Sequence, residues 1–331
     1  MKVLLTGSTG FLGGHMAEGL VGRGHEAVAM SRKGSNTSLL RDLGVELIHG
    51  DVTDAPSLVC ATKDVDSIIH LAAYYTFFGR KDIYERVNVE GTRNLISSAM
   101  ENGVTRFIHC SSTEAIGPVE NPPGNELTPP RPAYDYGRSK LASERVVESY
   151  GSLGLDYTIM RPSGIYGPRN IDDVAFWTIV SYAKNALGTR FYIGPGESHV
   201  QFCHVNDIVE GFMLALEKPE LSSGRTYIIS DERAYTYREV YALLSEITGR
   251  KGPSLHLPKA IAKAMILPIE SYYRLARKSN FLYCTSTVEA VTSERSYCID
   301  RIRDELGFRP RYDLRTGLAE TVEWYKDNGY I

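Results

Sequence analysis

The stretch Thr6-Gly7-Ser8-Thr9-Gly10-Phe11-Leu12-Gly13 decides the fold, because it follows the apolar run Lys2 to Leu5 without a gap and leads into a helical pattern that extends to Arg23. Glycines with this spacing permit a tight turn, close approach of the backbone to a pyrophosphate, and packing of the helix onto the strand. The N-terminus of the helix then faces the anion. The sequence therefore predicts a phosphate-binding turn with the candidate cofactor-binding residues Gly7, Thr9, Gly10, Phe11, Leu12 and Gly13.

Short apolar runs alternate with amphipathic stretches along the first half of the chain. The predicted strands are Lys2 to Leu5, Glu26 to Met30, Val45 to His49, Ser67 to Leu71, Arg106 to Cys110 and Asp156 to Met160. Helical connections between such strands require right-handed crossovers and a parallel sheet that is covered on both faces. The expected fold class is α/β, a doubly wound (Rossmann) sheet over residues 1–170. A smaller, mainly α-helical substrate-binding region over residues 171–331 is partly interleaved with it and contains short predicted strands such as Arg190 to Ile193 and Thr226 to Ile229.

Residues after the next three strands complete the expected cofactor site. Met30-Ser31-Arg32-Lys33 places cations where an acidic residue would select NAD, so NADP(H) is favoured, through Arg32, and NAD(H) is the alternative. Asp51 and Val52 follow the third strand, where a carboxylate can accept from an adenine amino group. The small residues of Leu71-Ala72-Ala73 let the backbone approach the cofactor.

Tyr136 and Lys140 lie four residues apart on a predicted helix from Tyr136 to Tyr150, and so share one face. A phenol with an ordinary pKa near 10 exchanges a proton at neutral pH only if its anion is stabilised, which a neighbouring ammonium does. Taken alone, this pair is more often a solvated helix face. Together with the glycine-rich turn and Ser111-Ser112-Thr113 after the fifth strand, it predicts a catalytic acid/base.

Eight ordered motifs carry a resemblance that spans nearly the whole chain. They are TGSTGFLG from Thr6, GDVTD from Gly50, HLAA from His70, NVEGT from Asn88, SSTEAIGP from Ser111, YGRSK from Tyr136, RPSGIYGP from Arg161 and HVNDIVEG from His204. The chain resembles an extended short-chain dehydrogenase/reductase of the NAD-dependent epimerase/dehydratase family. Within this family, its motifs most resemble those of 3β-hydroxysteroid dehydrogenase-like and dihydroflavonol reductase-like members.

The resemblance implies site residues. Tyr136 would be the acid/base, Lys140 would hold the nicotinamide ribose and lower the pKa of Tyr136, and Ser112 would orient the reacting oxygen. Ser112 is preferred over Thr113 because it stands five residues before Gly117. Asn88 has two readings, a proton relay or helix packing, and Arg161, Pro162 and Ser163 resemble the segment that lines the nicotinamide pocket.

The resemblance also bears on the reaction. A dehydratase would carry Asp-Glu where this chain has Thr113-Glu114, although Glu114 remains a candidate second acid. The expected activity is interconversion of a secondary alcohol and a ketone by hydride transfer, on an apolar, steroid-like or polycyclic substrate. The alternatives are a UDP-sugar 4-epimerase that retains NAD and a silent dinucleotide-sensing protein. A sugar nucleotide would need cations, for which only scattered candidates such as Arg190 and Arg233 are present.

Composition limits the classes of molecule that the protein is expected to bind. A balance of 37 basic and 40 acidic side chains disfavours nucleic acid. Five cysteines without paired spacing suggest neither a disulfide framework nor a metal site, and the absence of a signal-peptide pattern suggests a cytoplasmic protein. The apolar stretch Ala260 to Lys278, interrupted by Pro268, predicts two short amphipathic helices that form a lid, a peripheral membrane contact or ordinary domain packing. The resemblance implies a homodimer through helices matching Asp82 to Asn102 and Tyr136 to Tyr150.

Overall fold

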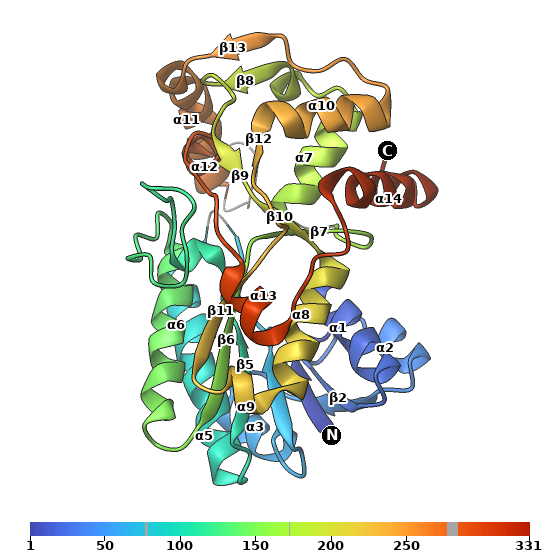
Figure 1. The fold of residues 1–331 in the computed structure, drawn as a ribbon, viewed down its shortest axis with the longest axis vertical. Coiled ribbons are helices and arrows are strands. Elements are labelled where there is room, and N and C mark those ends of the chain that lie inside the picture. The colour runs from blue at the N-terminus through green and yellow to red at the C-terminus, as the bar shows by residue number, and fades with distance from the viewer. Residues whose placement is uncertain (77–78, 172, 277–283) are drawn as a thin grey trace.

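A seven-stranded parallel sheet forms the centre of the larger part of the molecule (Figure 1). The computed structural model describes residues 1–331 except 77–78, 172 and 277–283. The strands of this sheet are β1 (Lys2–Thr6), β2 (Glu26–Ser31), β3 (Glu46–His49), β4 (Ser67–His70), β5 (Arg106–Cys110), β6 (Asp156–Pro162) and β11 (Arg225–Ile229). Each predicted strand of the first half is present, with bounds that shift by one or two residues at most.

The strand order is β11-β6-β5-β4-β1-β2-β3, so the direction of winding reverses between β1 and β4. In register, Leu5 of β1 lies opposite Ala29 of β2 on one side and Ile69 of β4 on the other. Ligands of open parallel sheets bind outside the carboxyl ends of the strands at this switch point. The glycine-rich turn and Leu71-Ala72-Ala73 both begin there.

Helices cover both faces of the sheet, as a parallel sheet requires. Helices α1 (Phe11–Gly22), α8 (Val205–Glu217) and α13 (Asp300–Leu306) contribute to the core on one face. Helices α3 (Ala55–Ala61), α5 (Gly91–Glu101) and α6 (Asp135–Gly151) contribute to the core on the other. The short helices α2 (Ser38–Asp42) and α9 (Pro219–Ser222) lie at the periphery. The expected doubly wound fold is confirmed.

A smaller region lies beyond the carboxyl ends of the strands (Figure 1). Its strand pairs are β7 (Gly164–Tyr166) with β10 (Phe202–His204), β9 (His199–Val200) with β12 (Tyr235–Thr236), and β8 (Phe191–Ile193) with β13 (Leu255–Leu257). Its helical elements are α7 (Val174–Ala183), η3 (Leu187–Arg190), α10 (Tyr237–Thr248), α11 (Lys259–Leu275), α12 (Thr285–Val291) and α14 (Leu314–Asp327). A third apolar cluster, which includes Tyr166, Phe176 and Leu318, holds it together.

Two segments differ from their expected place or form. The predicted strand Thr226 to Ile229 does not belong with the short strands of the substrate side, because as part of β11 it pairs with β6 at the edge of the large sheet. The helical pattern Asp82 to Asn102 is divided into α4 (Lys81–Tyr84), the π-helical turn η1 (Glu85–Glu90) and α5. The wider turn carries Asn88, whose side chain is buried.

The expectation of two helices around Pro268 is wrong within the described residues, since α11 runs through the proline as one helix of 17 residues. Proline removes one N–H donor and clashes with the carbonyl four residues earlier. That carbonyl belongs to Ala264, which is exposed and so open to water. Ser271 also donates to the carbonyl of Leu267 at 2.8 Å, which adds a local hydrogen bond beside the proline. Arg277 and Lys278 of the predicted stretch lie outside the described residues.

Candidate active site

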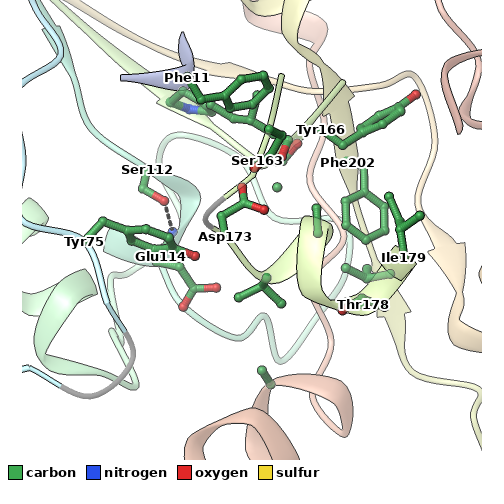
Figure 2. Close-up of a pocket in the computed structure, with 18 of the residues that line it drawn as sticks. Phe11, Tyr75, Ser112, Glu114, Ser163, Tyr166, Asp173, Thr178, Ile179 and Phe202 are labelled. Atoms are coloured by element: carbon green, nitrogen blue, oxygen red, sulfur yellow. Dashed lines mark hydrogen bonds between the residues drawn. The ribbon is translucent and has the colours of Figure 1, made fainter. Parts of the chain in front are cut away.

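One large cavity, of about 1090 Å³, runs between the carboxyl edge of the sheet and the smaller region. Its walls come from the glycine-rich turn, the loop after β4, the segment after β5, the start of α6 and several elements of the smaller region. Figure 2 shows Phe11 and Ser112 with Tyr166 and Phe202 around this space. Residues far apart in sequence therefore share one site.

The glycine-rich turn is sterically closed to side chains. Gly7 has φ of +68°, and a Cβ there would lie 2.7 Å from the backbone nitrogen of Ala72. A Cβ on Gly13 would lie 2.1 Å from the carbonyl oxygen of Gly7. Helix α1 begins after Gly10 with no side-chain cap, so its first N–H groups face the cavity edge without a protein side chain as acceptor. The turn thus fits a pyrophosphate group, which such a helix N-terminus stabilises.

The cavity brings together most of the predicted site residues and leaves five out. Those that line it are Gly7, Thr9, Gly10, Phe11, Leu12, Gly13, Arg32, Leu71, Ala73, Ser112, Tyr136, Pro162 and Ser163. Ala72 contributes its backbone beside Gly7, and Lys140 lies behind Tyr136 on α6. Val52 is buried against the Cβ position of Gly91, and so helps packing instead of lining the cavity.

Arg32 lies at the junction of the main cavity and a second, open depression. That depression is lined by Arg32, Lys33, Gly34, Ser35, His49, Asp51, Thr53 and Asp54. One carboxylate oxygen of Asp51 accepts from the backbone N–H and the hydroxyl of Thr53, both at 2.8 Å. The loops after β2 and β3 thus offer cations and an oriented carboxylate where the sequence places the adenosine half of a dinucleotide.

Tyr136 and Lys140 lie on the first turns of α6; Lys140 is buried, and Tyr136 is half-buried in the cavity wall. The Lys140 ammonium donates to the carbonyl oxygen of Cys110 at 2.5 Å, which ties it to the end of β5. The ring of Tyr75 packs edge-on against the ring of Tyr136, with centroids 4.8 Å apart. Ser112 Oγ accepts from the backbone N–H of Glu114 at 3.1 Å.

Burial is the largest cause of the pKa shifts of Tyr136 and Lys140. It raises the pKa of the Tyr136 phenol well above 10, with further increases from Cys110 and Glu114, whereas a hydrogen bond with Ser112 lowers it. Burial also lowers the pKa of Lys140. The net shift of the Tyr136 pKa is therefore upward, opposite to the lowering expected from Lys140, because burial penalises the phenolate. Tyr136 is held in its protonated form, ready to donate.

The side chains of Asn88 and Arg161 form hydrogen bonds with other protein groups and do not line the cavity. Asn88 accepts from the backbone N–H of Tyr74 at 2.7 Å and donates to Ser139 Oγ at 2.9 Å. It is absent from the cavity wall, which favours the packing reading over a proton relay. Arg161 forms a two-pronged, buried ion pair with Glu144, at 2.8 and 2.7 Å, and so turns away from the cavity, unlike Pro162 and Ser163.

The substrate side of the cavity is apolar and aromatic. Its lining includes Ile165, Tyr166, Ile179, Phe191, Phe202, Tyr237, Val240, Tyr241, Leu244 and Ile266. The cations among the described lining residues are Arg32, Arg169 and Arg295. Arg169 forms a two-pronged pair with Glu18, and Arg295 binds Glu114 at 2.7 Å. Arg190 and Arg233 are not part of the wall.

Sequence reasoning missed Arg295 as part of this wall, whereas the tyrosines of the C-terminal half, including Tyr235, Tyr237 and Tyr241, are expected from the sequence to meet an apolar ligand. Arg295 lies 181 residues after Glu114, and nothing in the local pattern connects the two. A signal was present for Tyr237 and Tyr241, which are four apart on a helical pattern and whose hydroxyls favour a polar edge on an apolar site. Tyr237 lines the cavity and Tyr235 does not, a difference that depends on the tertiary structure.

Comparisons with known proteins place this geometry among related folds. The model of the "NAD dependent epimerase/dehydratase family" matches residues 3–230. Sterol demethylase protein B of Methylococcus capsulatus is 31% identical over 340 residues, across 100% of both chains. A 3-beta-hydroxysteroid dehydrogenase of Mycolicibacterium neoaurum is 26% identical, over 98% of this chain and 92% of that one.

A solved structure agrees with the fold. The dTDP-glucose 4,6-dehydratase DesIV from Streptomyces venezuelae, with NAD bound, is similar at a TM-score of 0.80 and 25% identity, and the match covers 99% of this chain and 98% of that chain. Together with the glycine-rich turn at the switch point, the family match over more than two thirds of the chain is decisive. The chain is an NAD-dependent enzyme of the short-chain dehydrogenase/reductase type and belongs to the epimerase/dehydratase family.

Proposed function

We propose that this enzyme interconverts a secondary alcohol and a ketone on an apolar, steroid-like or polycyclic substrate. The observation that carries the proposal is the apolar wall opposite Ser112 and Tyr136. A sugar nucleotide brings a diphosphate, which needs cations. Apart from Arg32 at the adenosine end, the cations among the described lining residues are Arg169 and Arg295, which already pair with Glu18 and Glu114. The relatives named for sterol and steroid chemistry support the same choice.

The residues present fit a nicotinamide dinucleotide along the carboxyl edge of the sheet. The Gly7 to Gly13 turn would hold the pyrophosphate, and Pro162 and Ser163 would flank the nicotinamide. When bound, the nicotinamide supplies or accepts the hydride at the carbinol carbon. Arg32 and Lys33 in the adenosine depression favour NADP(H) over NAD(H), because they can pair with a 2′-phosphate.

The proton is moved by the chain's own residues. In ketone reduction, Ser112 donates a hydrogen bond to the carbonyl oxygen, and Tyr136 gives its phenolic proton to that oxygen as the new C–H bond forms. In alcohol oxidation the same proton returns to the phenolate. The Lys140 ammonium, anchored on the Cys110 carbonyl, stabilises the transient phenolate electrostatically.

The test is Tyr136→Phe, with NADPH and a panel of cyclic ketones and 3-oxosteroids as probes. We expect kcat to fall about 10²- to 10⁴-fold, the usual contribution of a general acid/base. The affinity for NADPH should stay close to wild type. Tyr150→Phe is the matched control, because Tyr150 lies at the far end of α6, where its hydroxyl bonds Ser97 Oγ at 2.8 Å.

Three outcomes would reject parts of the proposal. Activity above about 1% of wild type in Tyr136→Phe contradicts the acid/base role. Interconversion of UDP-glucose and UDP-galactose without added cofactor, with NAD that copurifies, identifies a 4-epimerase instead. Tight NADPH binding with no turnover of any probe by wild type identifies a dinucleotide-sensing protein.

We also propose that α11 closes the substrate end and rests on a lipid surface. Ile266 lines the cavity, whereas Met265, Tyr272 and Leu275 are 60%, 62% and 86% exposed. The one acid on α11, Glu270, is buried and accepts from the backbone N–H of Thr285 at 2.8 Å. An apolar outer face without an exposed acid is typical of helices that lie in a membrane interface. No helix among the described residues is long and apolar enough to cross a membrane.

Assembly and location complete the proposal. We propose a homodimer through α5 and α6, which lie side by side on one face of the sheet. We propose a cytoplasmic location, because none of Cys60, Cys110, Cys203, Cys284 and Cys298 forms a disulfide in the described part of the chain.

A further inference from the structure

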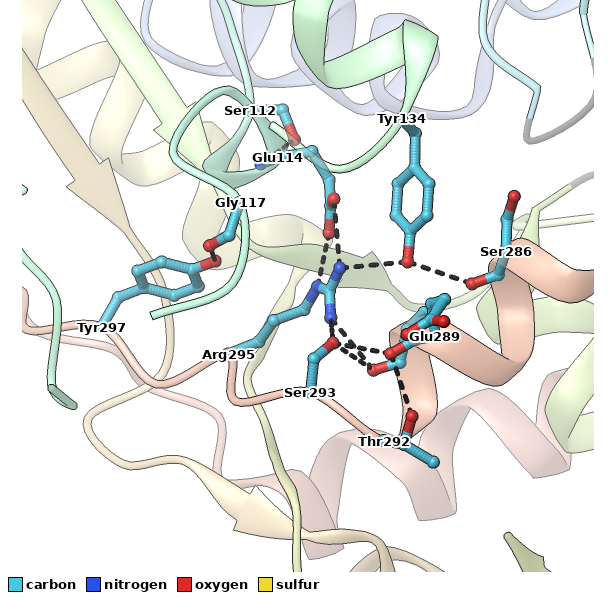
Figure 3. Close-up of polar contacts among 11 residues, drawn as sticks. Ser112, Glu114, Gly117, Tyr134, Ser286, Glu289, Thr292, Ser293, Arg295 and Tyr297 are labelled. Carbon is cyan, nitrogen blue, oxygen red and sulfur yellow. Dashed lines mark hydrogen bonds and ion pairs between the residues drawn. The ribbon is translucent and has the colours of Figure 1, made fainter. Parts of the chain in front are cut away.

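Arg295 occupies a buried position between the catalytic segments and the substrate-side helix α12 (Figure 3). Its Nε donates to Glu114 Oε1 at 2.7 Å, and its Nη2 donates to Glu114 Oε2 at 3.4 Å and to the hydroxyl of Tyr134 at 3.2 Å. Its Nη1 donates to the carbonyl oxygen of Ala290 at 3.0 Å and to Ser293 Oγ. A planar guanidinium can hold such divergent partners at once, which an ammonium cannot.

The partners of Arg295 lie next to the proposed catalytic pair. Glu114 stands two residues after Ser112, and its backbone N–H donates to Ser112 Oγ at 3.1 Å. Tyr134 stands two residues before Tyr136 and is the N-cap residue of α6. Its hydroxyl donates to the carbonyl oxygen of Ser286, in the first turn of α12, at 3.0 Å. The Arg295 guanidinium therefore connects Glu114, which follows Ser112, and Tyr134, which precedes Tyr136, to α12 and the residues just after it.

Helix α12 faces the substrate space, because Thr287, Ala290 and Val291 line the cavity. Arg295 therefore connects a helix that lines the substrate space to the segments that hold Ser112 and Tyr136. The Glu114 carboxylate, in turn, is occupied by two N–H groups of a permanent cation. An acid/base must exchange protons with the substrate, and a carboxylate held in this way is poorly suited to that role.

We propose that Arg295 is a positioning residue that sets the geometry of the Ser112–Tyr136 pair and couples it to substrate contact at α12. Glu114 is its anchor and not a second acid. The proposal rests on the roles assigned above to Ser112 and Tyr136.

The test compares Arg295→Met, Arg295→Lys and Glu114→Gln, with NADPH and the ketone that wild type reduces best. A displacement of reacting groups by about 1 Å costs about 10²-fold in rate. We therefore expect a loss of that order in kcat for Arg295→Met, partial rescue by Arg295→Lys, and unchanged NADPH affinity in both. Glu114→Gln should lower kcat without changing the shape of the pH profile.

Arg106→Met is the matched control for a buried arginine. Arg106 binds Asp156 at 2.8 Å, Ala215 O at 2.7 Å and Ser222 Oγ at 2.8 Å, at the start of β5 and away from the cavity. We expect this variant to lose stability, as Arg295→Met does, while its folded fraction keeps the wild-type kcat. A loss of stability alone therefore cannot imitate the positioning effect.

Hydrogen exchange of the full-length chain supplies a readout that needs no substrate. Exchange in residues 111–117 and 133–138 should rise in Arg295→Met and stay at the wild-type level in Arg106→Met. If wild type reduces no ketone, the proposed function fails. Hydrogen exchange still tests whether Arg295 couples α12 to the segments that hold Ser112 and Tyr136. Wild-type kcat or unchanged exchange in Arg295→Met would overturn the proposal, as would loss of one limb of the pH profile in Glu114→Gln.

Discussion

Two hydroxyl groups, those of Ser112 and Tyr136, meet in the cavity because neighbouring atoms leave them limited freedom. The backbone N–H of Glu114 occupies one acceptor site of Ser112, and burial keeps the Tyr136 phenol protonated. A protonated phenol suits ketone reduction directly. In alcohol oxidation its anion must be stabilised as it forms, which is the role proposed for Lys140.

We expect the choice between NADP(H) and NAD(H) to depend on a single side chain, that of Arg32. We expect Arg32→Asp to weaken NADP(H) binding by about 10- to 100-fold, because a hydrogen bond to a charged group contributes about 1.5 to 3 kcal/mol. The new carboxylate should favour the ribose hydroxyls of NAD(H). Titration of both cofactors by fluorescence measures the two dissociation constants.

Arg41→Asp is the control for this charge reversal, since Arg41 is an exposed cation on α2 outside both cavity walls. It should leave the ratio of the two dissociation constants at the wild-type value. Tighter binding of NAD than NADP by the wild-type enzyme would refute the role given to Arg32.

At the scale of elements, α11 shows how one helix serves two environments. Its buried positions Ala262 and Glu270 face the protein on the same side as Ile266, which reaches the cavity, because residues four apart share a helix face. The outer face carries the exposed apolar side chains. Opening and closing of this one helix would expose the substrate space to whatever surface the outer face touches.

The membrane proposal is tested by co-sedimentation with vesicles of phosphatidylcholine and phosphatidylglycerol. We expect wild type to pellet with the vesicles and the triple variant Met265→Ser, Tyr272→Ser, Leu275→Ser to remain in solution. A large apolar side chain contributes about 1.5 to 3 kcal/mol on full burial, so losing three should lower partitioning by at least about 10²-fold.

Leu127→Ser is the matched control, because Leu127 is 77% exposed in a loop outside α11. It should pellet like wild type. Equal pelleting of the triple variant, or no pelleting of wild type, would exclude α11 as a lipid contact.

At the scale of the whole molecule, buried histidines link stability to pH. Burial lowers the pKa of His70 to about 3 and of His204 to about 4, and also lowers the pKa values of His15 and His109. These groups are neutral in the folded chain but titrate near 6.5 when unfolded. The unfolded state thus binds more protons, and the stabilisation present above pH 6.5 is lost as pH falls toward the folded-state values.

Asp231 has the opposite effect on stability. Burial raises its pKa to about 6, so as pH falls the folded state binds a proton at Asp231 before the unfolded state does. With this offset, we expect the free energy of unfolding to fall by on the order of 2 to 4 kcal/mol per pH unit near pH 5. Urea unfolding at pH 7, 6 and 5 measures the slope. His109→Gln should reduce the slope by about 1.4 kcal/mol per pH unit, and a flat profile between pH 7 and 5 would contradict the assignment.

Local patterns were sufficient for the elements of the large sheet and for the phosphate turn. Strands such as β5 were predicted to the residue, because a short apolar run between helical patterns has one stable place in a parallel sheet. The glycines of the turn are required by contacts within a few residues and across one strand pair. The Tyr136 and Lys140 pair likewise follows from helix periodicity.

The sequence by itself thus determined the doubly wound fold, the glycine-rich turn at the carboxyl edge of the sheet and the family, because these depend on short-range spacing. Only the tertiary structure decided that β11 returns to the large sheet, that α11 runs through Pro268, and that Arg295 neutralises Glu114. Each of these depends on partners or solvent that sequence spacing does not encode. Packing across the chain therefore determines the charge balance of the substrate space.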